Sequence, residues 1–272
     1  MMGLTSLTTM LRPRIVSVAI VSKWSLKERE MGMCKSSFKL LHLAYKVANL
    51  QCRYGSTDSI HTQGSSEHNH VNFETMKIIL GSSSMARKRI LSEMGYEFSI
   101  MTADIDEKSI RKDTPEELVM ALAQAKADAI VARLRNMGKL EEDTHATLLI
   151  TADTVVVYKG MVREKPTSKE EARYFIKGYS GSHAAVVGSV LVTNLATGKR
   201  KGAWERAEVY FHDIPDEIID NLIEERVTFN VAGGLMLEHP LTSPYVEAVV
   251  GSADTVMGLS KALTEKLIAE VL

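Results

Sequence analysis

Hydrophobic and polar positions in the middle of the chain predict two buried strand segments with a polar interval between them. Residues 148–150 form a continuous apolar run, typical of a strand buried on both faces, and residues 155–158 resume a β-rich run. Asp153 lies in the interval, where a carboxylate is costly to desolvate unless a cation or a metal meets it. Lys165, beyond a Lys-Gly turn, is a candidate for that cation. The alternative is an aspartate that caps a turn at the end of a strand.

The first periodic segment predicts a strand, a serine-rich loop and a helix. Residues 77–80 are a β-type run, residues 81–84 read Gly-Ser-Ser-Ser, and apolar positions at helical spacing follow as far as Gly95. Ser84 is placed to cap this helix, and the first N–H groups of the helix form an anion site with the hydroxyls and the basic residues 87–89. A plain N-cap beside a solvated basic face is the alternative. No Walker phosphate-loop pattern is present.

The other periodicities complete an α/β pattern. Residues 104–107 hold three carboxylates, which suit either a divalent cation or a solvated turn. Lys126 falls on a helix that opens with a capping box, where a lysine is ordinarily a surface residue. Further expected elements are a strand at 97–101, a helix from 114 to about 135, a helix at 168–177 closed by Gly178, strands at 184–193 and 204–211 that form an antiparallel hairpin, a helix from Pro215, a strand at 246–250 and a final helix at 259–271.

Length, composition and charge describe an ordinary folded protein. The 272 residues are 45% hydrophobic and 25% charged, which is enough to bury the core of one large domain or of two lobes. No apolar run of 18 residues exists, so we expect no membrane span, and the net charge of −1 gives no reason to expect nucleic acid. The only two cysteines, Cys34 and Cys52, form no disulfide framework and fit a reducing compartment.

Residues 1–75 differ from the remainder of the chain. They contain nine basic and five acidic residues, and the first 27 residues carry no acid at all, as in an organellar transit peptide. Residues 55–72 are a polar tract that is typical of a disordered linker. We therefore expect residues 1–75 to be a disordered or targeting extension and residues 76–272 to be the functional domain. The expected location is the cytoplasm, or an organelle if the extension acts as a transit peptide.

Seven short motifs occur in one order between residue 77 and the end of the chain. They read Leu-Gly-Ser-Ser-Ser-Met-Ala-Arg, Asp-Ile-Asp-Glu, Thr-Ala-Asp-Thr-Val-Val, Glu-Lys-Pro, Ser-Gly-Ser-His, Ala-Gly-Gly and Gly-Ser-Ala-Asp-Thr-Val-Met-Gly-Leu. Each motif alone is a weak signal, but the ordered set closely resembles the Maf family, whose members are nucleoside triphosphate pyrophosphatases. Residues 1–75 lie outside the resemblance.

The resemblance implies a fold, a reaction and partners. The fold is the α/β type of Maf proteins and inosine triphosphatases, a twisted mixed sheet with flanking helices in two lobes around a central cleft. The reaction is cleavage of the α–β phosphoanhydride of a nucleoside triphosphate to a monophosphate and pyrophosphate, with Mg²⁺ or Mn²⁺, in removal of unwanted or modified nucleotides. The resemblance also implies a homodimer.

Residue by residue, the resemblance assigns a site that agrees with elementary chemistry. A triphosphate needs several cations, and a carboxylate can accept a proton from water or hold a metal that lowers the pKa of that water. The matched positions are Ser82, Ser84 and Arg87 in the phosphate-binding loop, Glu107 at the acidic metal position, the lysines Lys126 and Lys165, and Asp153 as the general base and second metal ligand.

Departures from the family pattern leave the preferred base open. Ala86 stands where many bacterial members have the first of two arginines, and Glu164 replaces the glycine of Gly-Lys-Pro. Thr154 resembles the branch that acts on dTTP and UTP, whereas Glu238 resembles the branch that acts on 7-methyl-GTP. We expect both side chains to contact the substrate.

Two other functions stay open at this point. One is a non-catalytic nucleotide-binding regulator of cell division, in keeping with the family's original naming for septum formation. The other is a phosphomonoesterase, which releases inorganic phosphate in place of pyrophosphate. Joint presence of Asp153, Lys126 and Lys165 favours the pyrophosphatase.

Overall fold

The computed structural model describes residues 76–138 and 147–272. The expected extension of residues 1–75, with its linker and targeting segment, lies outside the described residues. Within them, no helix is both long enough and apolar enough to cross a membrane.

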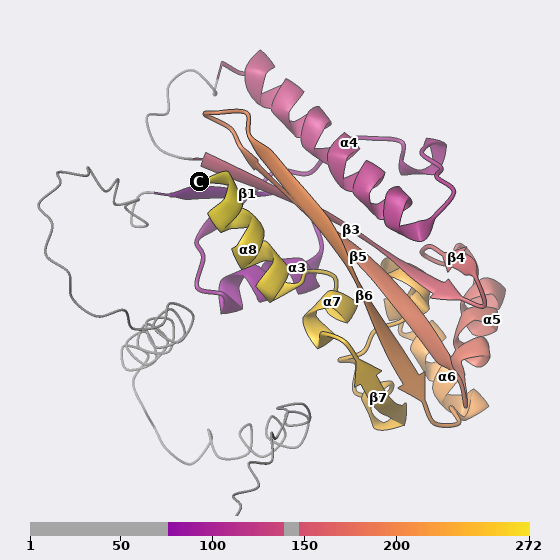
Figure 1. The fold of residues 1–272 in the computed structure, drawn as a ribbon. Helices are drawn as coiled ribbons and strands as arrows, with labels where there is room; N and C mark the ends of the chain where they lie inside the picture. Colours follow the sequence, from indigo (N-terminus) through magenta and orange to yellow (C-terminus); the bar gives the residue numbers. More distant parts are fainter. Residues whose placement is uncertain (1–75, 139–146) are drawn as a thin grey trace, which may run out of the picture. The chain divides into compact units, whose positions relative to one another are not determined.

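One mixed sheet forms the centre of the described chain (Figure 1). Its strands run in the order β2-β1-β3-β5-β6-β7, and the short β4 pairs with β3 alone. Strand β1 is parallel to both of its neighbours, and the other pairings are antiparallel. The strands are β1 (Lys77–Leu80), β2 (Phe98–Ile100), β3 (Thr147–Tyr158), β4 (Met161–Arg163), β5 (His183–Asn194), β6 (Arg200–Phe211) and β7 (Val246–Val250).

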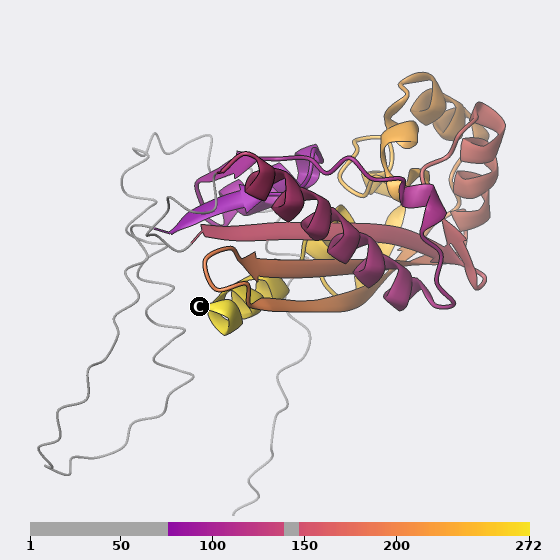
Figure 2. The ribbon, with the colours of Figure 1, turned by 90° about the horizontal axis from the view of Figure 1, so that it is seen from above.

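Helices cover both faces of this sheet, as expected for an α/β protein (Figure 2). Helix α4 (Pro115–Asn136) runs along one face, and α8 (Lys261–Val271) packs on the other together with α3 (Met85–Glu93). The remaining helices are α5 (Lys169–Tyr179), α6 (Asp216–Glu224) and α7 (Ala253–Met257). Short 3₁₀ turns occur at Glu107–Ser109, Val227–Asn230, Ala232–Gly234 and Ser243–Tyr245.

Strand β3 is one continuous strand, whereas the sequence predicted two segments with an interval. It pairs with β5 without interruption from Leu148 to Val157, and Asp153 lies opposite Ser189 in that ladder. The polar interval therefore stays in the strand, because the neighbouring strand supplies backbone partners along its whole length. The alternative of an aspartate that caps a turn is wrong.

Alternate residues of β3 pack against different helices, because they lie on opposite faces of the sheet. Leu149, Val155 and Val157 pack with α4, whereas Leu148, Ile150 and Ala152 pack with α3 and α8. Further along, the same face as Ala152 packs against α5 and α6 through Val156 and Tyr158. A strand buried on both faces explains the continuous apolar run in the sequence.

The second edge of β3 is covered only at its two ends. Strand β1 pairs with residues 147–150, and β4 pairs with residues 156–158. Among the described residues, 151–155 therefore have a strand partner on the β5 side alone. Asp153 and Thr154 lie in this uncovered stretch. Residues from other parts of the chain can therefore approach them at the edge of a buried strand.

Most predicted elements are confirmed, with three further differences besides the continuity of β3. Helix α5 continues through Gly178 to Tyr179, because the aromatic ring of Tyr179 is buried in the core beside Phe211. Neither strand β4 nor the five-residue α7 was predicted. Both are too short to show a periodic pattern.

Candidate active site

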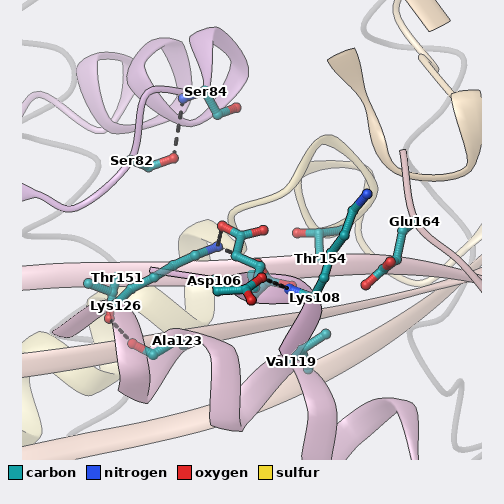
Figure 3. Close-up of polar contacts among 12 residues, drawn as sticks. Ser82, Ser84, Asp106, Lys108, Val119, Ala123, Lys126, Thr151, Thr154 and Glu164 are labelled. Carbon is teal, nitrogen blue, oxygen red and sulfur yellow. Dashed lines mark hydrogen bonds and ion pairs between the residues drawn. The ribbon is translucent and has the colours of Figure 1, made fainter. Parts of the chain in front are cut away.

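Asp153, Lys126 and Glu107 form a charged cluster on the α4 side of the sheet. Lys126 Nζ lies 2.5 Å from Asp153 Oδ1 and 3.0 Å from Glu107 Oε1. Lys126 and Asp153 are buried, while about half of the Glu107 side chain is exposed. Figure 3 shows Lys126 reaching from α4 towards the turn that carries Asp106. The cation that meets Asp153 is thus Lys126 and not Lys165.

The strands hold α4 in the position that brings Lys126 to Asp153. Thr151 Oγ1 donates to the backbone carbonyl of Ala123 at 2.8 Å, and Ser189 Oγ donates to that of Val119 at 2.7 Å. Helix α4 begins with a Thr114 cap and proline in its first turn, as the sequence predicted. Lys126 is buried, contrary to the ordinary expectation for a helical lysine, because its helix face packs on the sheet.

Arg87 gathers the serine loop, Thr154 and the end of α7. Its guanidinium donates to Gly258 O at 2.8 Å, to Thr154 Oγ1 at 3.0 Å and to Ser82 Oγ at 3.2 Å. Ser84 caps α3, accepting a hydrogen bond from the Arg87 backbone N–H, and its own N–H donates to Ser82 Oγ. Four of the predicted substrate-binding residues, Ser82, Ser84, Arg87 and Thr154, therefore lie together.

The two groups belong to one site. Burial lowers the pKa of the Arg87 guanidinium, while the charges of Asp153 and Glu107 raise it, which places these carboxylates within electrostatic reach of Arg87. Asp153 and Thr154 are consecutive in β3, so their side chains leave opposite faces of the sheet. The site therefore extends around the uncovered edge of β3, with the charged cluster on one face and Arg87 on the other.

Lys165 and Glu164 lie on the segment that follows β4. Glu164 Oε1 is 3.5 Å from Arg111 Nη1, and its backbone carbonyl accepts a hydrogen bond from Gly233 N–H at 2.8 Å. Gly233 has a φ of 61°, and a Cβ there would lie 2.7 Å from both Tyr179 Oη and Val156 Cβ, so glycine is required. Lys165 is exposed and has no ion-pair partner among the described residues.

Glu238 is held by a cation from another part of the chain. Arg89 Nη2 on α3 lies 3.5 Å from Glu238 Oε1 and contacts Met257 Sδ at 3.3 Å. Met257 precedes Gly258, the residue whose carbonyl binds Arg87. Glu238 is thus connected to the Arg87 group only indirectly, through Arg89 and Met257. Among the described contacts it makes no hydrogen bond to Arg87 itself.

Gly258 and Asp254 are site residues that the sequence reasoning did not single out. Asp254 Oδ2 accepts the Lys261 backbone N–H at 2.6 Å, and Asp254 O accepts that of Gly258 at 3.0 Å. Gly258 has a φ of 110°, which favours glycine. This turn aims the Gly258 carbonyl at Arg87. The signal was present in the Gly-Ser-Ala-Asp-Thr-Val-Met-Gly-Leu motif, but the spacing alone does not reveal that a backbone oxygen acts.

The carboxylates of Asp153 and Glu107 are suitable ligands for a divalent cation. Each places an oxygen within 3.0 Å of the same Lys126 nitrogen, so both oxygens already converge on one cation. Mg²⁺ and Mn²⁺ prefer such hard oxygen ligands, and Mg²⁺ is commonly held by one or two carboxylates plus phosphates and waters. In ranges 76–138 and 147–272, no three His, Cys, Asp or Glu side chains gather into a protein-only cage. The pair fits a metal that is shared with a phosphate.

The fold and site together define an α/β protein built to handle phosphate, and comparison with known proteins gives its family. The family model described as Maf-like protein matches residues 77–271, so the chain belongs to the Maf-like protein family. This confirms the resemblance drawn from the seven motifs.

Three relatives have names that state an activity. The 7-methyl-GTP pyrophosphatase of Dictyostelium discoideum is 38% identical over 194 residues, which cover 71% of this chain and 96% of that protein. The nucleoside triphosphate pyrophosphatase of Salinispora tropica is 28% identical over 196 residues, covering 72% and 84%. The dTTP/UTP pyrophosphatase of Pelotomaculum thermopropionicum is 32% identical over 186 residues, covering 68% and 92%.

Proposed function

We propose that this chain is a nucleoside triphosphate pyrophosphatase, which hydrolyses the α–β phosphoanhydride and releases a nucleoside monophosphate and pyrophosphate. The observation that carries the proposal is the buried carboxylate of Asp153, paired with Lys126 from α4 at the uncovered edge of β3, where Arg87 from α3 binds the next residue, Thr154. Membership of the Maf-like family and the activities in its relatives' names support it.

Asp153 acts as the proton acceptor in this proposal. Its side chain is about one-tenth exposed, so a water at the edge of β3 can reach it while most competing water is excluded. The carboxylate takes a proton from the attacking water as that water bonds to the α-phosphorus, and pyrophosphate leaves. Lys126, beside Asp153 in the free protein, offers its charge to the phosphate oxygens, which become more negative in the transition state.

Arg87 and the serine loop bind the phosphate chain. Arg87 is already oriented by three neutral oxygens, so little side-chain entropy is lost when an anion arrives. The first turn of α3, which begins at the Ser84 cap, adds the positive end of the helix dipole. Asp153 and Glu107 would hold a divalent cation here, which when bound neutralises phosphate charge and activates water.

The direct test is an assay of the released anion. Purified chain is given Mg²⁺ or Mn²⁺ and a panel of nucleoside triphosphates, and pyrophosphate and phosphate are quantified separately. We expect pyrophosphate and monophosphate in equal amounts. Release of inorganic phosphate alone would instead identify a phosphomonoesterase.

The regulator alternative makes the opposite prediction. A non-catalytic nucleotide-binding regulator leaves every triphosphate intact while still binding it. Nothing in the described residues or in the relatives' names favours this alternative. The same assay, combined with equilibrium binding of nucleotide, separates it from the enzyme.

For the preferred base we propose a 7-methylguanine nucleotide. The relative with 38% identity is named for 7-methyl-GTP, and Glu238 supplies a carboxylate near the Arg87 group. A carboxylate accepts two hydrogen bonds from the N1 and N2 groups of guanine, and N7 methylation adds a positive charge that the carboxylate favours. Thr154 does not discriminate between bases here, because its hydroxyl is engaged by Arg87.

Competition between substrates tests this preference. Rates with 7-methyl-GTP, GTP, dTTP and UTP are compared for the wild type and for Glu238→Gln. We expect the highest kcat/KM with 7-methyl-GTP and a smaller preference in the variant. Equal selectivity in both proteins would remove Glu238 from base recognition.

We further propose that residues 1–75 are dispensable for the chemistry and that the protein works in the cytoplasm. Chains that start at Met1 and at Met76 should then release pyrophosphate at equal rates. A reporter fused to residues 1–75 should stay in the cytoplasm, and delivery to an organelle would show that the segment is a transit peptide. Gel filtration with light scattering tests the expected homodimer.

A further inference from the structure

Lys126 stands between the two carboxylates that fit a metal. Lys126 Nζ forms ion pairs with Asp153 Oδ1 at 2.5 Å and with Glu107 Oε1 at 3.0 Å, and only about one-tenth of its side chain is exposed. Two hydrogen bonds from β3 and β5 to the backbone of α4, made by Thr151 and Ser189, restrain the helix that carries it. The ammonium is therefore held where both carboxylates converge.

Charge in this cluster is already nearly balanced. Two carboxylates face Lys126, and a second cation, Arg87, binds Thr154, the residue after Asp153, on the other side of the β3 edge. A divalent cation that binds alone must share these oxygens with an ammonium a few ångströms away, where repulsion between like charges is strong. A cation that arrives with a triphosphate brings its own negative charge.

We propose that Lys126 is an internal cation that competes with the divalent metal for Asp153 and Glu107, so that the metal binds tightly only together with the triphosphate. The triphosphate oxygens take over the ammonium, and the two carboxylates are released to the metal. The inference rests on the proposed function, since it concerns the same site. By linkage, metal and nucleotide then raise each other's affinity by the same factor.

The test measures Mn²⁺ binding and not turnover. Free Mn²⁺ is followed by its electron paramagnetic resonance signal while the full chain is titrated, with and without an α,β-methylene nucleoside triphosphate, which has no cleavable α–β anhydride. We expect weak Mn²⁺ binding by the wild type alone and at least tenfold tighter binding with the analogue. Equal affinity in both conditions would overturn the proposal.

Lys126→Met removes the competing cation. This variant should bind Mn²⁺ without nucleotide at least tenfold more tightly than the wild type. Lys112→Met is the matched control, because it removes an exposed lysine that has no ion pair with either carboxylate. Its nucleotide-free Mn²⁺ affinity should equal that of the wild type. Equal gains in the two variants would show a general charge effect and refute competition at Lys126.

Lys126→Met is expected to lower stability, since the variant leaves Asp153 without its cation, so a second measurement compares the thermal stability of the variant and the wild type with and without Mn²⁺. Mn²⁺ should raise the melting temperature of the variant more than that of the wild type, and an equal or smaller rise contradicts the proposal. Failure of the proposed function is separate: the wild type would then release no pyrophosphate from any triphosphate. Pyrophosphate release with unchanged Mn²⁺ affinity in Lys126→Met would leave the function standing and reject only the competition.

Discussion

The two faces of β3 carry one site but are built from different chemistry. On the α4 face, Lys126 pairs directly with Asp153 and Glu107. On the other face, the three hydrogen bonds of the Arg87 guanidinium go to neutral oxygens, two hydroxyls and one backbone carbonyl. Opposite charges are therefore paired directly in the first group, whereas the guanidinium of the second group makes no direct contact with a carboxylate among the described hydrogen bonds.

This difference separates two tasks. A guanidinium held by neutral partners keeps its attraction for an anion, so the Arg87 group is suited to binding phosphate in the ground state. A carboxylate held by one ammonium, at the edge of a buried strand, is suited to exchanging protons or sharing a metal. Variants on the α4 face should therefore change kcat, and variants on the Arg87 face should change KM.

The largest effect is expected for Asp153→Asn. The amide keeps the size of the side chain but cannot accept the proton from water, so kcat should fall by about 10²-fold or more. Steady-state pyrophosphate release measures this, with circular dichroism to verify the fold. Asp128→Asn is the control on the same helix as Lys126, because Asp128 forms an exposed ion pair with Arg200. Unchanged turnover in Asp153→Asn would remove Asp153 from the mechanism.

Arg87→Ala should raise KM with a smaller change in kcat. Hydrogen bonds to charged groups contribute about 1.5–3 kcal/mol, which corresponds to a KM increase of roughly 10- to 100-fold. Initial rates over a range of triphosphate concentrations give both constants. Lys88→Ala, at a neighbouring cation whose side chain makes no hydrogen bond to a site residue within the described part of the chain, should leave KM nearly unchanged, because the backbone hydrogen bond from Lys88 to Ser84 is kept. A normal KM in Arg87→Ala would contradict the division between the two faces.

Asp254→Ala should produce a weaker version of the Arg87 effect. Asp254 fixes the turn that aims the Gly258 carbonyl at Arg87, so its loss should raise KM several-fold without contact to substrate. In the Arg87→Ala background the same change should have no further effect on KM, because Asp254 acts on the substrate only through Arg87. Asp254→Asn should recover part of the affinity. Additive effects in the double variant would mean that Asp254 acts independently of Arg87.

The smallest change is expected for the hydroxyls that hold α4. Thr151→Val removes the hydrogen bond to Ala123 O, which keeps its helical partner within α4, so the free energy of unfolding should fall by about 1 kcal/mol. Thr193→Val is the control in β5, since the buried Thr193 hydroxyl has no hydrogen-bond partner among the described residues. Urea unfolding measures both. Equal losses would show that the bond to α4 contributes nothing.

Sequence patterns predicted most of the fold because a long hydrophobic pattern has the period of either a helix or a strand, and this period identifies the element. The hairpin of β5 and β6 and the helix α4 followed from such runs, and both are confirmed. The continuity of β3 did not follow, because Thr-Ala-Asp-Thr reads as a break until β5 supplies partners for it. Tertiary pairing overrides local polarity there.

Prediction of the site was less complete. The family resemblance assigned Asp153 and Lys126 to the site, but spacing could not show that Lys126, 27 residues before Asp153, is its ion-pair partner. Lys165, the partner expected from the sequence, makes no ion pair among the described residues, whereas α4 packs directly on the strand and brings Lys126 to Asp153. A backbone carbonyl such as that of Gly258 has no side-chain signature at all.

The most direct test of the account combines the released anion with nucleotide binding in one comparison. Wild type and Asp153→Asn are given the same triphosphate with Mg²⁺, and pyrophosphate release and bound nucleotide are measured in parallel. The account predicts that the wild type releases pyrophosphate and that the variant binds nucleotide but turns it over at least about 10²-fold more slowly. Pyrophosphate release at the same rate by both proteins would contradict it.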